Sequence, residues 1–93
     1  MNLLMLFERI KNRIVYEYRN KVFYYRTGYK VNLIGDIILM NKNWKIKNWK
    51  IGKNVTIYPY IQIFGDGIIE IGDNVAIGTG TIIYSSKNGG GYI

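Results

Sequence analysis

The sequence contains no cysteine, no histidine and only one proline among its 93 residues. Without cysteine the chain has no disulfide, no thiolate nucleophile and no sulfur ligand for zinc. Without histidine it also lacks the Ser-His-Asp triad and the commonest general base. A chain this short makes at most one domain and buries only about 60% of its unfolded surface, so we expect a partner subunit or further sequence to complete it.

The positive charge is concentrated in the first half of the chain. Residues 1–50 carry eleven Lys/Arg and three Asp/Glu (11 − 3 = +8), whereas residues 51–93 carry two and three (2 − 3 = −1). All five leucines precede residue 40, and residues 46–93 contain twelve isoleucines and no leucine. Since leucine suits helices and β-branched isoleucine suits extended chain, the sequence predicts a helical region followed by a β region.

The first region, residues 1–30, predicts a basic amphipathic helix over residues 3–26. Its apolar residues recur every three or four positions: Leu3, Leu4, Phe7, Ile10, Ile14, Val15, Tyr18, Val22 and Tyr25. Lys11 and Lys21 project to the apolar side, where their ammonium groups must reach water or phosphate headgroups. Gly28 predicts the end of the helix. We expect the stripe to cover the open end of the β region, to lie on an anionic membrane, or both.

The apolar start of the chain is interrupted by charged residues far short of the ~20 residues that a membrane span requires. It also lacks the basic start of a signal peptide. The sequence therefore predicts a cytoplasmic protein, peripheral to the inner face of the membrane where the helix meets it.

Residues 51–93 repeat with a period of six. Each block begins with isoleucine, at Ile51, Ile57, Ile63, Ile71, Ile77 and Ile83. Two places before these stand Trp49, Val55, Ile61, Ile69, Val75 and Thr81. A period of six fits neither a helix nor simple strand alternation, and it predicts a coil with flat sides and tight corners.

In such a coil the six leading isoleucines point inward and stack on those of the next coil. We expect the glycines at 52, 72 and 78, or neighbouring asparagines, to turn the corners with positive φ. Exposed positions are predicted at Lys53, Tyr58, Asp73 and Lys87.

Blocks 51–56 (IGKNVT) and 71–76 (IGDNVA) resemble the repeat of the hexapeptide-repeat acyltransferases. The resemblance covers residues 46–93 and implies a mainly β fold, a left-handed parallel β-helix of about two coils that follows the N-terminal helix. Residues 31–50 would then be a connecting segment and first partial coil, and residues 51–93 the repeat coils. At about eighteen residues per coil, the separations 71 − 51 = 20 and 93 − 71 = 22 leave two and four extra residues, which we place at residues 65–67 and 85–91. Ile93 would begin a third coil, which indicates an N-terminal fragment.

The family resemblance also implies a function, that of an acyl-CoA-dependent O-acetyltransferase. It implies acetyl-CoA as donor, a sugar or polysaccharide-precursor hydroxyl as acceptor, a homotrimer, and a histidine base on a later coil. No histidine occurs here, so we predict no catalytic residue, no metal ligand and no activity for these 93 residues alone, and the cofactor-binding residues stay unassigned. The alternative function is a non-catalytic module whose basic helix binds an acidic surface, a membrane before nucleic acid.

Several smaller motifs have simpler structural interpretations. Asp66, Glu70 and Asp73 could form a carboxylate pair but stand at predicted turns. Residues 54–56 form a glycosylation sequon that the repeat already explains. Residues 78–80 (GTG) lack the lysine and the helix of a phosphate-binding loop.

The aromatic residues also allow two interpretations. Tryptophans and lysines alternate over residues 44–50, as in single-strand nucleic-acid binders, but Trp49 falls in the repeat register and Trp44 could cap the coil stack. Tyr58, Tyr60 and Tyr84 are predicted as outward strand residues, at a subunit contact if there is one.

Overall fold

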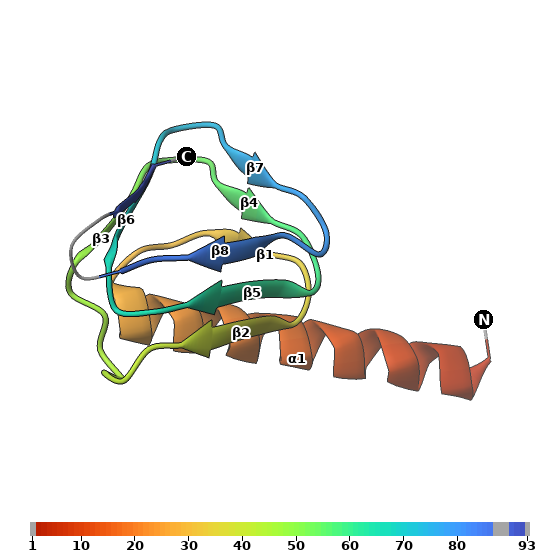
Figure 1. Ribbon diagram of the computed structural model, residues 1–93. Coiled ribbons are helices and arrows are strands. Elements are labelled where there is room, and N and C mark those ends of the chain that lie inside the picture. The colour runs from red at the N-terminus through yellow and green to blue at the C-terminus, as the bar shows by residue number, and fades with distance from the viewer. Residues whose placement is uncertain (1, 87–89, 93) are drawn as a thin grey trace.

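The described part of the chain folds into one long helix followed by nine short strands (Figure 1). The computed structural model describes residues 2–86 and 90–92. The elements are α1 (Leu3–Thr27), β1 (Asn32–Leu33), β2 (Ile37–Met40), β3 (Trp49–Ile51), β4 (Thr56–Ile57), β5 (Ile61–Phe64), β6 (Ile68–Ile71), β7 (Ala76–Ile77), β8 (Ile82–Tyr84) and β9 (Gly90–Tyr92). The predicted order of one N-terminal helix and then short parallel strands is confirmed.

Helix α1 is capped at both ends. The side chain of Asn2 accepts a hydrogen bond of 2.9 Å from the backbone N–H of Met5, which satisfies a free donor of the first turn. Gly28 adopts the left-handed conformation with φ of 81°, and its N–H donates to the carbonyl of Tyr24. The predicted stop at Gly28 is therefore confirmed, and the last helical residue is Thr27, one residue beyond the predicted Arg26.

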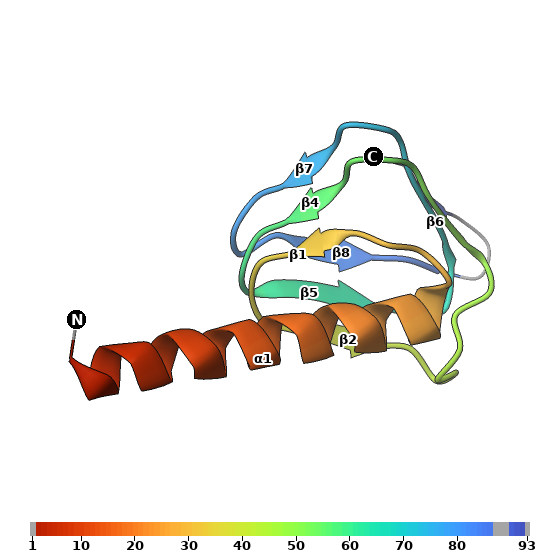
Figure 2. The same cartoon turned by 180° about the vertical axis from the view of Figure 1, so that it is seen from behind.

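The strands form three parallel sheets of three strands each, in the orders β1-β4-β7, β2-β5-β8 and β3-β6-β9. The chain visits the three sheets in turn, so each coil lies on the previous one and the sheets enclose a common interior (Figures 1 and 2). Trp49 pairs with Ile69, a separation of 69 − 49 = 20, and Glu70 pairs with Tyr92, a separation of 92 − 70 = 22. These are the spacings that the isoleucine repeat predicts.

The stack contains three coils, one more than the repeat indicates. Residues 32–51 supply β1, β2 and β3, which form a complete first coil where the sequence suggests a connecting segment and a partial coil. Leu33 pairs with Ile57, a separation of 57 − 33 = 24, because residues 41–48 form a loop between β2 and β3. That loop breaks the period of six, so the repeat in the sequence does not reveal the first coil. Ile93, the predicted start of another coil, lies outside the described residues.

The interior is filled by the side chains that the repeat places inward. Buried positions include Ile51, Ile57, Ile63, Ile71 and Ile77, while Ile83 is partly buried and packs against this core. Among the residues two places earlier, Trp49, Val55, Ile61 and Ile69 are buried, and Val75 and Thr81 are partly buried. Lys53, Tyr58 and Asp73 are exposed as predicted, and Lys87 lies outside the described residues. The inward register is therefore confirmed.

Of the two kinds of residue expected at the corners, the asparagines turn the chain and the glycines do not. Glycines 52, 72 and 78 do not have positive φ; Asn54 and Asn74 do, at 58° and 59°. The Asn54 amide donates to the side-chain oxygen of Asn74 over 2.9 Å, so the two corners support each other. Gly52 serves another purpose, because a Cβ there would lie 2.3 Å from a carboxylate oxygen of Asp73. Glycine at this position permits the close approach of neighbouring coils.

We expect replacement of Ile71 by Asp to unfold the domain, because the side chain is 3% exposed and the carboxylate would have no partner in the stack. The loss should be about 4 kcal/mol or more. Lys53→Gln, at an exposed corner of the preceding coil, should change the free energy of unfolding by less than about 0.5 kcal/mol. Thermal or urea denaturation measures both, and equal tolerance of the two substitutions would contradict the inward register.

A second pair of substitutions tests the corners. Gly65 has φ of 99°, and a Cβ there would lie 1.8 Å from the carbonyl oxygen of Ser85. Gly65→Ala should cost about 2 kcal/mol or more, from left-handed strain and from the displacement of Ser85. Gly78→Ala is the control, since nothing lies within 4 Å of its Cβ position. A stability loss of similar size for both would contradict the described corner.

Candidate functional site

Helix α1 lies across the first coil and projects well beyond it, as both views of the ribbon show (Figures 1 and 2). The contacting side is formed by Tyr16, Asn20, Phe23 and Thr27, which are spaced four, three and four residues apart on one helix face. Phe23 is 2% exposed, and its ring centroid lies 6.4 Å from that of Trp49. This aromatic pair anchors the C-terminal half of the helix on the core.

A side-chain amide takes the place of a neighbouring strand at the edge of the first coil. Asn20 donates to the carbonyl of Leu33 over 3.0 Å and accepts from the N–H of Leu33 over 2.9 Å. Tyr16 contributes a hydrogen bond to the side chain of Asn32 in the same strand. Because an uncovered strand edge invites pairing with other chains, Asn20 closes β1 where the helix crosses it.

The C-terminal end of the helix is tied to the loop of residues 41–48. The N–H of Ile46 donates to the carbonyl of Arg26 over 2.6 Å, and the Arg26 Nε donates to the carbonyl of Trp44 over 2.9 Å. The guanidinium carbon also lies 4.7 Å from the centroid of the Trp44 ring. Burial lowers the pKa of Arg26 from its ordinary value. Arg26 therefore holds the loop under the helix.

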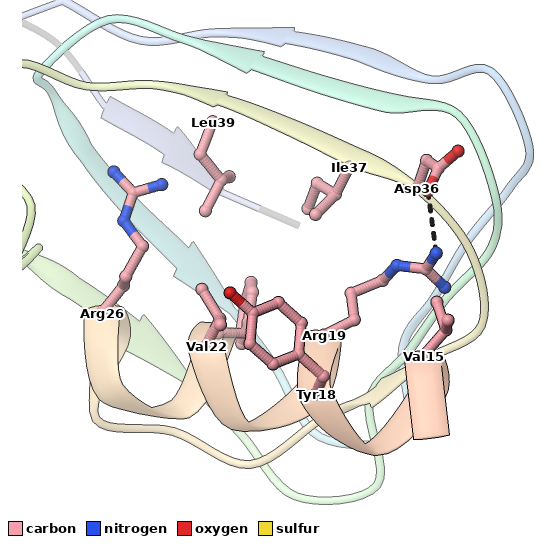
Figure 3. A pocket seen from close by; sticks show the side chains of 9 residues that line it. Val15, Tyr18, Arg19, Val22, Arg26, Asp36, Ile37 and Leu39 are labelled. Carbon is pink, nitrogen blue, oxygen red and sulfur yellow. Dashed lines mark hydrogen bonds and ion pairs between the residues drawn. The ribbon is translucent and has the colours of Figure 1, made fainter. Parts of the chain in front are cut away.

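A groove of about 340 Å³ runs between α1 and β2 (Figure 3). Its walls are mainly apolar, and its lining residues are Val15, Tyr18, Arg19, Val22, Phe23, Arg26, Asp36, Ile37 and Leu39. At one end Arg19 donates to the carboxylate of Asp36 over 2.8 Å. Figure 3 shows Ile37 and Leu39 directed from β2 toward the helix, with Arg26 at the opposite end from Arg19.

The groove offers binding surface and no evident base. Asp36 is its one carboxylate, and it is exposed and paired with Arg19. In residues 2–86 and 90–92 no group of three His, Cys, Asp or Glu residues is placed to hold a metal ion. Both arginines already have partners within the chain, so the groove mainly shows how α1 and β2 are held together.

The predicted carboxylate candidates are not brought together into a site. Asp66 accepts from the N–H of Lys42 over 3.0 Å, and Asp73 accepts from the N–H of Lys53 over 2.7 Å. Each thus joins its turn to the coil before it. Glu70 lies in β6 in register with Lys50 of β3. The predicted turn positions are confirmed for Asp66 and Asp73, whereas Glu70 was predicted at a turn and is a strand residue.

The remaining motifs also fall into the coil structure. Residues 54–56 form a corner and the start of β4, and residues 78–80 form a corner between β7 and β8. Trp49 belongs to the core, whereas Trp44 is exposed beneath Arg26 and does not cap the stack. Because Trp49 is buried and Trp44 is exposed, the two tryptophans do not form one alternating exposed surface.

The three predicted tyrosines are exposed as expected, but of these only Tyr84 lies in a strand; Tyr58 follows β4, and Tyr60 lies at a corner with φ of 65°. Tyr58, Tyr60 and Tyr84 are all exposed, and the ring of Tyr84 stacks on Phe64 of the neighbouring strand with centroids 5.3 Å apart. The outer surface of the β2-β5-β8 sheet therefore carries an aromatic ladder.

Most of the apolar stripe of α1 does not cover the first coil, which was one of the two positions expected for it; of its members, Val15, Tyr18 and Val22 line the groove beside β2. Leu3, Phe7, Ile10, Ile14, Tyr18 and Tyr25 are all exposed. They are spaced four, three, four, four and seven residues apart, so they share one face, which lies about 180° around the helix from Phe23. The N–H and carbonyl of Leu33 at the strand edge need hydrogen-bond partners, which the amide of Asn20 supplies and an apolar side chain would not. The helix therefore contacts the coil through the face that carries Asn20.

Hydrophobic periodicity does not reveal the face of α1 that contacts the coil. Of its four members only Phe23 is strongly apolar, so a search for hydrophobic periodicity finds the opposite face first. The available signal was the recurrence of Tyr16, Asn20, Phe23 and Thr27 at steps of four, three and four.

No helix in the part of the chain that the structure describes is long and apolar enough to cross a membrane.

No family model, no curated protein and no solved structure matches the chain. The candidate site is therefore defined by geometry alone: helix α1, with an inner face fixed to the first coil and an outer apolar face left open.

Replacement of Asn20 by Ala should destabilise the protein by about 1 to 3 kcal/mol, because it removes both hydrogen bonds to Leu33 and leaves these backbone groups without their partner. Asn12→Ala, at an exposed position of the same helix, should change stability by less than about 0.5 kcal/mol. Denaturant titration compares the two variants. Equal stability of both would show that Asn20 does not close the strand edge.

Proposed function

We propose that these 93 residues form the N-terminal coils of an acyl-CoA-dependent O-acetyltransferase of the hexapeptide-repeat class, wound as a left-handed parallel β-helix. The observation that carries the proposal is the stacking of buried isoleucines in three parallel sheets. Ile51 pairs with Ile71, and Ile57 pairs with Ile77, each at a separation of twenty residues. Few sequences maintain such a period through tight corners, and it is the pattern on which the resemblance to this class rests.

In this proposal the coils act as a scaffold and the reacting groups lie elsewhere. The 93 residues contain no histidine, so the base that removes the proton from the acceptor hydroxyl comes from outside them. Acetyl-CoA is the proposed donor, and a hydroxyl of a sugar or polysaccharide precursor is the proposed acceptor. The strands β7, β8 and β9 each pair with one neighbour in the described residues, and further coils would add to that edge.

The outer surface of the β2-β5-β8 sheet supports the proposed homotrimer. Its outward ladders are Ile38, Gln62 and Ile82, and Met40, Phe64 and Tyr84. None of the six carries a charge, and four of the five apolar members are exposed. An exposed, uncharged sheet face of this kind is typical of a subunit contact.

The test measures thiol release from acetyl-CoA with a panel of sugar acceptors. We expect no turnover above background from the 93-residue chain, since a missing general base alone lowers the rate by about 10²- to 10⁴-fold. A longer polypeptide that continues the repeat and contains a histidine should turn over, and alanine at that histidine should remove about the same factor.

Two results would contradict the proposal. Turnover by the 93-residue chain would mean that a carboxylate or a tyrosine serves as base. A longer polypeptide that neither binds acetyl-CoA nor releases thiol would show that the coils serve another function.

A further inference from the structure

The outer face of α1 is an apolar surface that the fold leaves without a partner. Leu3 is 79% exposed, Phe7 71% and Ile14 61%, although each is large and apolar. The helix has 25 residues and is therefore about 37 Å long. Its exposed apolar residues extend from the first turn to Tyr25, with Lys21 between Tyr18 and Tyr25, and we call this surface the band.

The position of this band suits a flat partner. The coils contact the helix through Asn20 and Phe23, on the side opposite the band. Figures 1 and 2 show the N-terminal half of the helix extending past the coils, with no other element beside it. A plane could therefore contact the band from Leu3 to Ile14 without meeting the coil stack, whereas Tyr18 also borders the groove beside β2.

The charges on the helix indicate which flat surface fits. Residues 3–27 carry six Lys/Arg and two Glu (6 − 2 = +4). Lys21 lies within the band and Lys11 lies beside it, and both side chains are exposed. Their long apolar stems can follow the band while the ammonium groups reach an anionic layer above it. Two copies of the band packed together would instead bury these ammonium groups, and the one acidic residue beside the band, Glu17, already pairs with Arg13.

We propose that the outer face of α1 binds the surface of an anionic lipid bilayer, with the helix axis in the plane of the membrane. This binding is independent of acetyl transfer and concerns a different surface. Leu3, Phe7, Ile10 and Ile14 enter the boundary between headgroups and acyl chains. Tyr18, Lys21 and Tyr25 lie at headgroup level, where amphipathic and cationic side chains are stable. The coil stack is held on the aqueous side by the inner face of the helix.

Vesicle binding of the full chain tests the proposal directly. Vesicles of phosphatidylcholine alone are compared with vesicles in which about a quarter of the lipid is phosphatidylglycerol, by co-sedimentation at low and high salt. We expect binding to the anionic vesicles to be at least about tenfold tighter and to weaken as salt rises, because exposed charges are screened. Equal binding to both vesicles, or binding to the anionic vesicles that salt leaves unchanged, would overturn the proposal.

A matched pair of double variants tests which face binds. The outer pair is Phe7→Ser with Ile14→Ser; the control pair is Met5→Ser with Asn12→Ser, on the inner side of the projecting part of the helix. All four positions are exposed and neither pair changes the net charge, so both should keep the melting temperature of the parent chain. The outer pair should lose about thirtyfold or more in affinity for anionic vesicles, and the control pair less than about fivefold.

Equal losses in the two pairs would overturn the assignment to the outer face. So would a chain that self-associates in lipid-free solution and becomes monomeric on substitution of Phe7 and Ile14, since the band would then join two copies. The comparison of neutral and anionic vesicles uses the unaltered chain, so it decides the proposal even if a variant does not fold.

Discussion

The structure depends on the stacking of inward side chains at matching positions in successive coils. Because the strands pair in parallel and in register, a side chain at one level lies directly above its equivalent one coil earlier, as Ile71 does over Ile51. Each strand is only two to four residues long, so no sheet could persist alone. The three sheets are stable together because they share one buried interior.

The same constraint determines where the chain can vary. Extra residues are accommodated at corners, where the backbone leaves the sheets, as the loop of residues 41–48 shows in the first coil. That loop contributes Ile46 to the core and an N–H donor to the carbonyl of Arg26. An insertion of this kind lengthens one coil without altering the register of the strands on either side.

A stack of coils has an open edge at its first strands, and α1 closes it with polar groups. The amide of Asn20 reproduces the donor and acceptor of a neighbouring strand, and Arg19 holds Asp36 at the end of β2. Because the side of the helix that carries Asn20 contacts the coil, the apolar side faces outward. The exposed stripe is thus a consequence of how the edge is closed, and it gives the helix two different binding faces.

The sequence by itself determined the helix, its end at Gly28, the inward isoleucines and the twenty- and twenty-two-residue coil spacings, because each depends on local propensity or on a repeat with one period. The tertiary structure decided three other features: that residues 32–51 form a complete coil, that Asn54 and Asn74 turn the corners in place of the glycines also expected there, and that Asn20 and Phe23 face the stack. These depend on which backbone groups lack partners after the chain has coiled. The hydrophobic pattern of a sequence does not show which backbone groups will lack partners. The apolar face of α1 was therefore recognisable in the sequence, but the direction in which it faces was not.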